Sequence, residues 1–357
     1  MQIDGHHALT YVVARHAGLD HAKAEILAYS AQYVDEATNS QPVQFSNGAM
    51  FNRNASAHKM LDYRNTNELA NHLAWIPFHF LPGNQGLKPE SEPDGSFIQR
   101  LVCTPDSYVA RDMLKAVAQH QTKPFGLHLM GIAMHVYADT FAHQGFAGVI
   151  HKINEVNEID SDVDGSLLSR VKDNFMSWGV STTSPLGHGA ALSFPDRPYA
   201  NWSYTNGLGQ RIERSNTETF MNAANQMYKA IRCYVEYDYD MNIDLQPDLT
   251  IEQMAPIEAA LHTITDEDGV ARHKQWLNLI QKGAFGFEPT LLEFIPHGEG
   301  SWKEKARGQG VMVDGEVKYQ YSKSFLASDW KMFHDALKTY RVDIIRDVLP
   351  KYGICVA

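Results

Sequence analysis

The stretch GIAMHVYADTFAH, residues 131 to 143, is the most informative part of this chain. His135, Asp139 and His143 follow one another at intervals of four residues, and each such step turns a helix by only about 40°. The three side chains therefore share one stripe of a helix that we predict over residues 124 to 144. Apolar residues fill most of the other positions, so this stripe should be buried, where polar groups are costly unless they are paired.

Two interpretations of the stripe are open. Two imidazoles beside a carboxylate suit a divalent cation such as zinc, and the carboxylate can bridge two ions. Alternatively, the three groups form a buried hydrogen-bonded ladder without metal. The chain contains 17 His and only 3 widely separated Cys, which favours imidazole and carboxylate over thiolate as ligands.

The remaining pattern is mostly helical. Apolar residues recur at helical spacing in several further segments, separated by loops rich in Gly, Pro, Asn and Ser. These predicted helices cover residues 8–17, 22–37, 106–121, 150–175, 215–237, 250–263, 266–282 and 328–349. Residues 310–321 alternate around Asp314-Gly315, which predicts a β-hairpin. We therefore expect an all-α fold with a small C-terminal β-hairpin.

The length allows two or three domains, or one large domain with additions. The chain has 357 residues, of which 44% are apolar and 20% charged, as in ordinary globular proteins. We predict a helical zinc-binding catalytic domain over residues 1–240. Residues 241–357 form an extension, either separate or part of the same domain.

The charge and the N-terminal segment restrict partners and location. The formal net charge of −11 argues against binding a bare phosphate backbone, so we expect no stable nucleic-acid complex. The first residues lack the basic and apolar regions of a signal peptide, and no apolar run is long enough to span a bilayer. We expect a cytoplasmic protein, with export by a signal-independent route as the alternative.

Further candidate ligands flank the central stripe. They are histidines and carboxylates near the N-terminus, at helix ends and in loops: Asp4, His6, Asp35, His58, His151, Glu155 and His188. Each has a simpler explanation when taken alone. The first two could belong to a frayed terminus, and His151 with Glu155 could be a solvated salt bridge on a helix. Near the central stripe, their number gives the metal interpretation more weight.

The order of these residues carries a family resemblance. The series consists of His6, Asp35, His58, His135, Asp139, His143, His151 and Glu155. It resembles the zinc-dependent phospholipase C and single-strand nuclease superfamily, including its bacterial metallophospholipase branch. The resemblance covers residues 1 to 240. It implies an all-helical fold with a cleft that holds two or three zinc ions.

The resemblance also implies which residues form each zinc site. The first site would consist of Asp35, His58, His135 and Asp139. The second would share Asp139 as a bridge and add His6, with Asp4 in place of the N-terminal tryptophan amine that binds metal in the family. The third would consist of His143, His151 and Glu155, with His188 as an alternative ligand.

These sites predict hydrolysis of a phosphodiester. Zinc neutralises the anionic substrate and lowers the pKa of a water toward about 7. We expect this water to attack phosphorus in line, with Asp35 accepting or orienting its proton and Asp139 as the second catalytic carboxylate. The expected enzyme is a phospholipase C acting on glycerophospholipids such as phosphatidylcholine. The alternatives are a single-strand nuclease or phosphatase of the same superfamily, and a non-catalytic helical protein with structural metals.

Aromatic residues supply candidate substrate contacts. The predicted substrate-binding residues are Phe78, His79, Asp196, Trp202 and Tyr204. Such rings could cage a choline cation, although core packing would explain them equally well. The C-terminal hairpin and helix could make a transient contact with a membrane surface.

Overall fold

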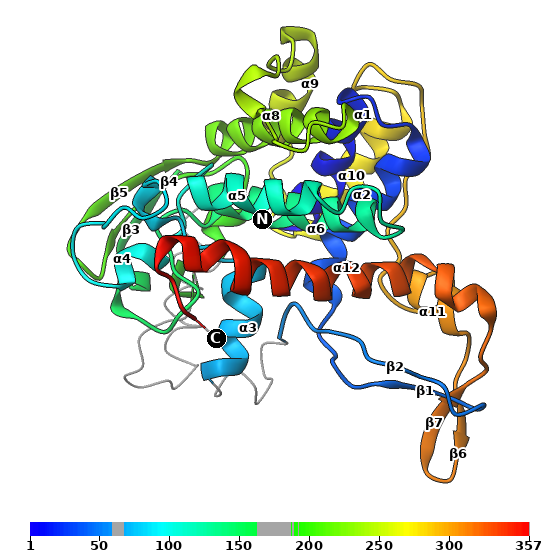
Figure 1. The fold of residues 1–357 in the computed structure, drawn as a ribbon. Coiled ribbons are helices and arrows are strands. Elements are labelled where there is room, and N and C mark those ends of the chain that lie inside the picture. Colours follow the sequence, from blue (N-terminus) through cyan, green and yellow to red (C-terminus); the bar gives the residue numbers. More distant parts are fainter. Residues whose placement is uncertain (59–67, 163–186, 188, 192, 357) are drawn as a thin grey trace.

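A computed structural model of the chain describes residues 1–58, 68–162, 187, 189–191 and 193–356. Helices form most of the molecule and surround α6 (Figure 1). The α-helices are α1 (Thr10–His16), α2 (His21–Glu36), α3 (Glu68–Phe78), α4 (Ile98–Leu101), α5 (Tyr108–Ala118), α6 (Gly126–Ala142), α8 (Asn216–Val235), α9 (Ile251–Thr263), α10 (Gly269–Gln281), α11 (Trp302–Arg307) and α12 (Asp329–Asp343). Two π-helical segments, η1 (Asp4–Leu9) and η9 (Ile344–Val348), adjoin α1 and α12.

Helix α6 is the centre of the fold. All its residues except Leu127 are buried, and α2, α5, α8 and α12 pack around it. A Cβ atom on Gly131 would lie 2.4 Å from the carbonyl oxygen of Leu27 and 2.6 Å from the Cβ of Ser30. The missing side chain therefore lets the backbones of α2 and α6 approach closely. This approach brings the C-terminal half of α2 against the polar stripe of α6.

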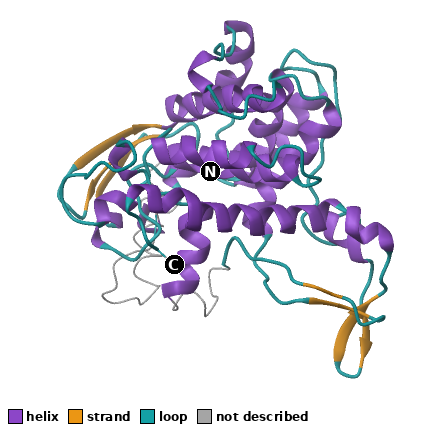
Figure 2. Ribbon diagram, viewed as in Figure 1, coloured by secondary structure: helices purple, strands orange, loops and turns teal. Residues whose placement is uncertain are grey.

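The prediction of an all-α fold is wrong, because the structure contains two sheets (Figure 2). Helices account for about 53% of the residues and strands for 10%, so the fold is mixed α/β. The four-stranded sheet has the order β2-β1-β7-β6 and the three-stranded sheet the order β3-β4-β5. The strands are β1 (Val43–Phe45), β2 (Met50–Phe51), β3 (Val156–Ser161), β4 (Asn201–Asn206), β5 (Arg211–Ser215), β6 (Val311–Val313) and β7 (Glu316–Tyr319).

Most of these strands lie where the sequence indicated loops or a helix. Strands β1 and β2 are short and lie in a segment rich in Asn, Ser and Gln, so their local pattern is weak. Strand β3 replaces the first part of the helix predicted over residues 150–175, of which residues 163–175 lie outside the described part. The hairpin at Asp314-Gly315 is confirmed, with φ values of 53° and 81°, but it pairs with β1 and does not stand alone.

The final helix is where the sequence placed it. Helix α12 packs against α6, and Trp330, Phe333 and Tyr340 are buried in the same hydrophobic cluster as the N-terminal helices. The division near residue 240 stays a prediction. Within the described residues, no helix is long and apolar enough to cross a bilayer.

Candidate metal centre

The stripe on α6 has the predicted geometry. His135, Asp139 and His143 are buried, with relative exposures of 0%, 1% and 4%. His135 Nε2 lies 3.3 Å from Asp139 Oδ2, and His143 Nε2 lies 3.6 Å from Asp139 Oδ1. Asp139 therefore lies between two imidazoles on the same helix face, with one carboxylate oxygen toward each.

The π-helical segment η1 brings His6 to this stripe. The ring of His6 stacks on that of His135, with centroids 3.7 Å apart. Its Nε2 lies 3.2 Å from Asp139 Oδ1, and the residue is only 1% exposed. A segment from the beginning of the chain therefore completes a buried group of two imidazoles and a carboxylate.

Helix α2 and the residue after α3 add a second group. His79 Nδ1 lies 3.2 Å from His135 Nε2 and 3.8 Å from Asp35 Oδ1. Asp35 Oδ1 lies 3.9 Å from His135 Nε2, and Gln32 donates a hydrogen bond to the other carboxylate oxygen of Asp35 at 3.2 Å. The side chain of Asp35 is 34% exposed, whereas that of His79 is 6% exposed. Asp35 therefore forms the open edge of the cluster.

Two sets of ligand atoms result, and they share His135. One set is His6, His135 and Asp139, and the other is Asp35, His79 and His135. Within each set the potential ligand atoms all lie within 4.8 Å of one another, close enough to surround one ion. Each set is able to hold one cation. Two cations at once would each need a different nitrogen of the His135 ring, because one imidazole nitrogen binds one ion.

Several buried polar atoms of the cluster make no hydrogen bond. Within the described part of the chain, Nδ1 of His6, Nδ1 of His135 and Oδ2 of Asp139 have no hydrogen-bond partner. Such atoms are rare in folded proteins because each costs about 1–3 kcal/mol of desolvation. These unsatisfied atoms fit a group of metal ligands, which would be satisfied by coordination.

Burial and charge keep the ligands in the ionisation states that metals bind. Burial, together with the neighbouring His135 and the Met1 ammonium, lowers the pKa of His6 to about 4. The imidazole is therefore neutral at pH 7, as coordination requires. Burial alone would raise the pKa of Asp139, but His143, the Met1 ammonium and His6 together lower it well below its usual range.

A third group of polar atoms lies beside the two ligand sets. The Met1 nitrogen is 2.5 Å from Asp139 Oδ1 and 3.2 Å from Asp196 Oδ1. His143 Nε2 lies 3.6 Å from Asp196 Oδ1, and its Nδ1 lies 2.7 Å from the carbonyl oxygen of His79. The buried ammonium thus provides a positive charge between two carboxylates. Asp196, which we expected to contact substrate, is part of the cluster.

The structure does not bring three of the predicted ligands into the cluster. Asp4 forms a buried ion pair with Arg272, with Oδ2 2.5 Å from Nε, so its carboxylate is already neutralised. His151 and Glu155 flank a short 3-10 turn, η4 (Lys152–Asn154), and are not on a helix. His151 Nδ1 accepts a hydrogen bond from the Ile153 amide. The helical spacing that suggested a third site is therefore absent.

Among the described residues, His58 and His143 are further predicted ligands that belong to neither ligand set. His58 is buried, with its ring centroid 6.2 Å from that of Trp75, and belongs to neither set. His188 lies outside the described residues.

The predicted aromatic substrate contacts are buried in packing. Phe78 packs on Tyr340, and Trp202 stacks on Tyr204 with centroids 4.9 Å apart. The Trp202 indole also donates a hydrogen bond to Asn216 Oδ1. These contacts explain the aromatic residues without a ligand.

The sequence led us to place His79 among the substrate-binding residues, with an additional metal ligand or a core histidine as the alternatives, and it did not indicate the Met1 nitrogen. His79 directly follows α3 and has no ligand-type neighbour at helical spacing, so its local sequence gives no metal pattern. The nearest available indication was that His79 is a lone polar residue in the apolar run WIPFHF, residues 75 to 80. The position of the Met1 nitrogen depends on how η1 packs against α6.

The fold and the cluster define an α-rich protein with two small sheets and a buried histidine–carboxylate centre where α2 meets α6. Residues 1–348 match the model of a protein family described as a family of unknown function, DUF6765. Because this match spans most of the chain, the protein belongs to that family. Neither a curated protein nor a solved structure matches the chain.

Proposed function

We propose that this protein is a zinc-dependent hydrolase of phosphodiesters, most directly of the phospholipase C type. The observation that carries the proposal is the convergence of three imidazoles and two carboxylates from separate elements, with unsatisfied buried ligand atoms. A purely structural polar network would normally satisfy its own hydrogen bonds. The order of His6, Asp35, His135, Asp139 and His143 along the chain supports the phosphodiesterase assignment through the family resemblance.

In this proposal each residue has a separate role. His6 and Asp139 would hold one zinc and Asp35 and His79 would hold the other, and each ion would use its own nitrogen of the His135 ring. When bound, zinc supplies a Lewis acid for a phosphoryl oxygen and lowers the pKa of the attacking water. Asp35 accepts the proton of that water, because it is the ligand-set carboxylate that reaches solvent.

The open edge at Asp35 sets the direction from which a substrate arrives. Asp139 is 1% exposed and cannot meet a substrate without displacement of other groups. The reacting phosphate therefore approaches past the C-terminal end of α2. In this proposal a glycerophospholipid such as phosphatidylcholine is the substrate.

The first test is metal content. The purified protein should contain about two zinc ions per chain by inductively coupled plasma mass spectrometry, in accordance with the two ligand sets. Asp139→Asn should lower this content, because the substitution removes a charged ligand. Asp329→Asn is the matched control, since Asp329 also pairs with a histidine of α6, His128, but lies outside both ligand sets.

The second test is hydrolysis of phosphatidylcholine and of single-stranded DNA. Wild type should release phosphocholine, and Asp139→Asn should be slower by at least about 100-fold. Release of nucleotides alone would move the proposal to a single-strand nuclease. Bound zinc without hydrolysis of either substrate would indicate a structural centre. Equal activity in wild type and Asp139→Asn would contradict the mechanism.

A further inference from the structure

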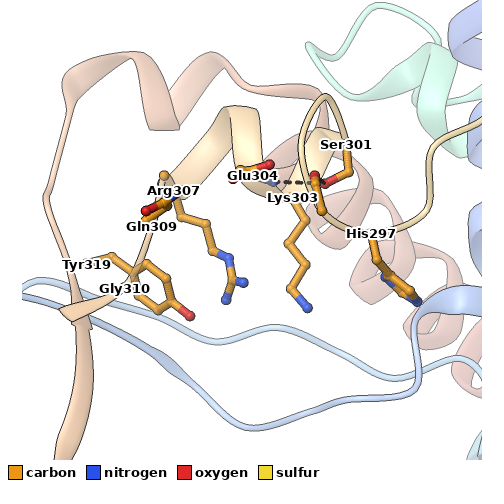
Figure 3. Close-up of a pocket in the computed structure, with 10 residues that line it drawn as sticks. His297, Ser301, Lys303, Glu304, Arg307, Gln309, Gly310 and Tyr319 are labelled. Carbon is orange, nitrogen blue, oxygen red and sulfur yellow. Dashed lines mark hydrogen bonds between the residues drawn. The ribbon is translucent and has the colours of Figure 1, made fainter. Parts of the chain in front are cut away.

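A second polar site lies at the base of the β6–β7 hairpin. It is a pocket of about 240 Å³. The pocket is lined by α11, by residues directly before and after α11, and by Tyr319 of β7. Its lining includes His297, Ser301, Lys303, Arg307 and Tyr319. Figure 3 shows the charged ends of Lys303 and Arg307 reaching toward the same side of the pocket, with Tyr319 on one flank and His297 on the other. None of these residues belongs to the histidine–carboxylate centre.

Aromatic rings fix the position of Arg307. Its guanidinium carbon lies 4.3 Å from the ring centroid of Tyr319 and 5.8 Å from that of Trp330. Within the described residues, Nε of Arg307 is buried and has no hydrogen-bond partner. A guanidinium that contacts aromatic rings can still donate its N–H groups to an oxyanion.

Cationic groups outnumber carboxylates around this pocket. Burial and the charge of Arg307 lower the pKa of Arg53, and Arg53 and Lys303 both contribute to lowering the pKa of His334. Arg53 and Arg307 are therefore close enough to repel each other, and both Arg53 and Lys303 lie near His334. A bound anion would relieve this repulsion.

Two described carboxylates, Glu304 and Glu36, lie near the cationic groups of this pocket. Glu304 is the one carboxylate among the lining residues. Figure 3 shows its carboxylate on the opposite side of the pocket from the ends of Lys303 and Arg307. Glu36 is paired with His297, whose Nε2 lies 3.3 Å from Glu36 Oε2. The side chains of Lys303 and Arg307 therefore bring two cationic groups to one side of the pocket.

We propose that this pocket binds a phosphate group, held by the Arg307 guanidinium and the Lys303 ammonium, with the Tyr319 hydroxyl as an additional donor. Phosphate is favoured because its oxygens accept bidentate hydrogen bonds from a guanidinium and pair with a point charge such as the Lys303 ammonium. The proposal does not depend on the hydrolase activity, because none of the residues is shared with the centre at α6.

The phosphate could belong to a soluble molecule or to a lipid headgroup. The pocket adjoins the β6–β7 hairpin, which projects from the body of the protein in Figure 1. Val311, Met312 and Val317 on this hairpin have relative exposures of 66%, 64% and 47%. A lipid phosphate in the pocket would place these apolar side chains at the same membrane surface.

Calorimetric titration with inorganic phosphate tests the pocket. Wild type and Asp139→Asn should both bind phosphate saturably, and Arg307→Gln should bind at least about tenfold more weakly because charge-assisted hydrogen bonds are lost. Arg346→Gln removes the same charge from an exposed arginine on η9 and should change the affinity less than about twofold. If Arg307→Gln does not fold, Lys303→Gln should weaken binding at least about threefold.

Three results would overturn the proposal: no saturable binding by wild type, unchanged affinity in the pocket variants, or loss of binding only in Asp139→Asn.

Sedimentation with vesicles then identifies the source of the phosphate. If it is a lipid, the protein should bind phosphatidylcholine vesicles that contain phosphatidic acid more strongly than vesicles of phosphatidylcholine alone. In that case Met312→Asp should reduce vesicle binding and leave phosphate binding intact. If the source is soluble, glycerol phosphate should bind and vesicles should not.

Discussion

Two adjacent histidines of η1 lie in two buried clusters of opposite character. His6 faces His135 and the carboxylate of Asp139, whereas His7 faces His273, with Nδ1 2.9 Å from Nε2. Burial lowers the pKa of the histidine in both places, to about 4 for His6 and about 4 for His273. The difference is that only the first cluster contains buried carboxylates. Burial alone therefore makes a neutral imidazole, and the nearby anions make it a candidate metal ligand.

The largest expected effect is on the shared ligand. His135→Asn should lower the content of both metal ions and slow hydrolysis by at least about 100-fold, because both ligand sets include this ring. His273→Asn, in the cluster without carboxylates, should leave the metal content unchanged. Metal quantification and a hydrolysis assay measure both. An equal loss of metal in the two variants would remove the distinction between the clusters.

The second effect separates binding from proton transfer. Asp35→Asn should leave the ion held by His6, His135 and Asp139 in place and lower kcat by about 10²–10⁴-fold, because the amide cannot accept a proton. The contrast with His135→Asn lies in the metal content, which should fall by no more than one ion. An unchanged kcat would rule out Asp35 as the proton acceptor.

The third prediction concerns how the buried His334 changes the free energy of unfolding at low pH. Burial, with Arg53 nearby, lowers the pKa of His334 to about 3 from the ordinary value of 6.5. Below pH 6.5 the unfolded chain therefore binds a proton that the folded chain does not. The free energy of unfolding should fall as the pH falls, by about 1.4 kcal/mol at pH 5.5 for this residue.

Urea unfolding at pH 7.5 and pH 5.5 measures this effect. His334→Phe keeps an aromatic ring against Trp330 and Phe51 but cannot titrate. Its stability should therefore depend less on pH by that amount. The same pH dependence in wild type and His334→Phe would show that the residue does not contribute.

The smallest expected effects are those of removing the N-terminal caps of α2 and α10. The Asp20 side chain caps α2, which carries Asp35, and the Asp268 side chain caps α10, which carries His273. Replacing either with Ala should lower the free energy of unfolding by about 1 kcal/mol in thermal or urea unfolding. Neither substitution should change the metal content, since both caps are remote from the ligands. A lower metal content in Asp20→Ala alone would instead link the cap of α2 to the centre.

The sequence predicted those parts of the centre that depend on local geometry. His135, Asp139 and His143 follow one helix, so their spacing alone places them on one face. The last helix is also a local feature, and the structure has it as α12. His79 could not be predicted as a neighbour of Asp35, because their proximity requires α2 and α3 to be packed against α6. His151 and Glu155 were predicted as ligands because their spacing suits one face of a helix. In the structure they flank the turn η4 and do not lie on a helix, so this spacing does not bring them together.

The sheets were missed for a similar reason. Strand β1 pairs in parallel with β7, and Gln44 and Lys318 are partners although they are far apart in the sequence. Short strands of two or three residues contain too little alternation to be recognised. Their stability comes from the partner strand, which a local pattern does not contain.

The close approach of α2 and α6 at Gly131 has a consequence for metal preference. Asp35 lies on α2 and His135 on α6. The close approach of the two helices at Gly131 therefore helps to set the distance between these two ligands. Zinc–oxygen and calcium–oxygen bonds differ by only about 0.3 Å. A methyl group at position 131 would meet the Leu27 carbonyl oxygen at 2.4 Å and force the helices apart. Relatives with a bulkier residue there could thus accommodate a larger cation with every ligand unchanged.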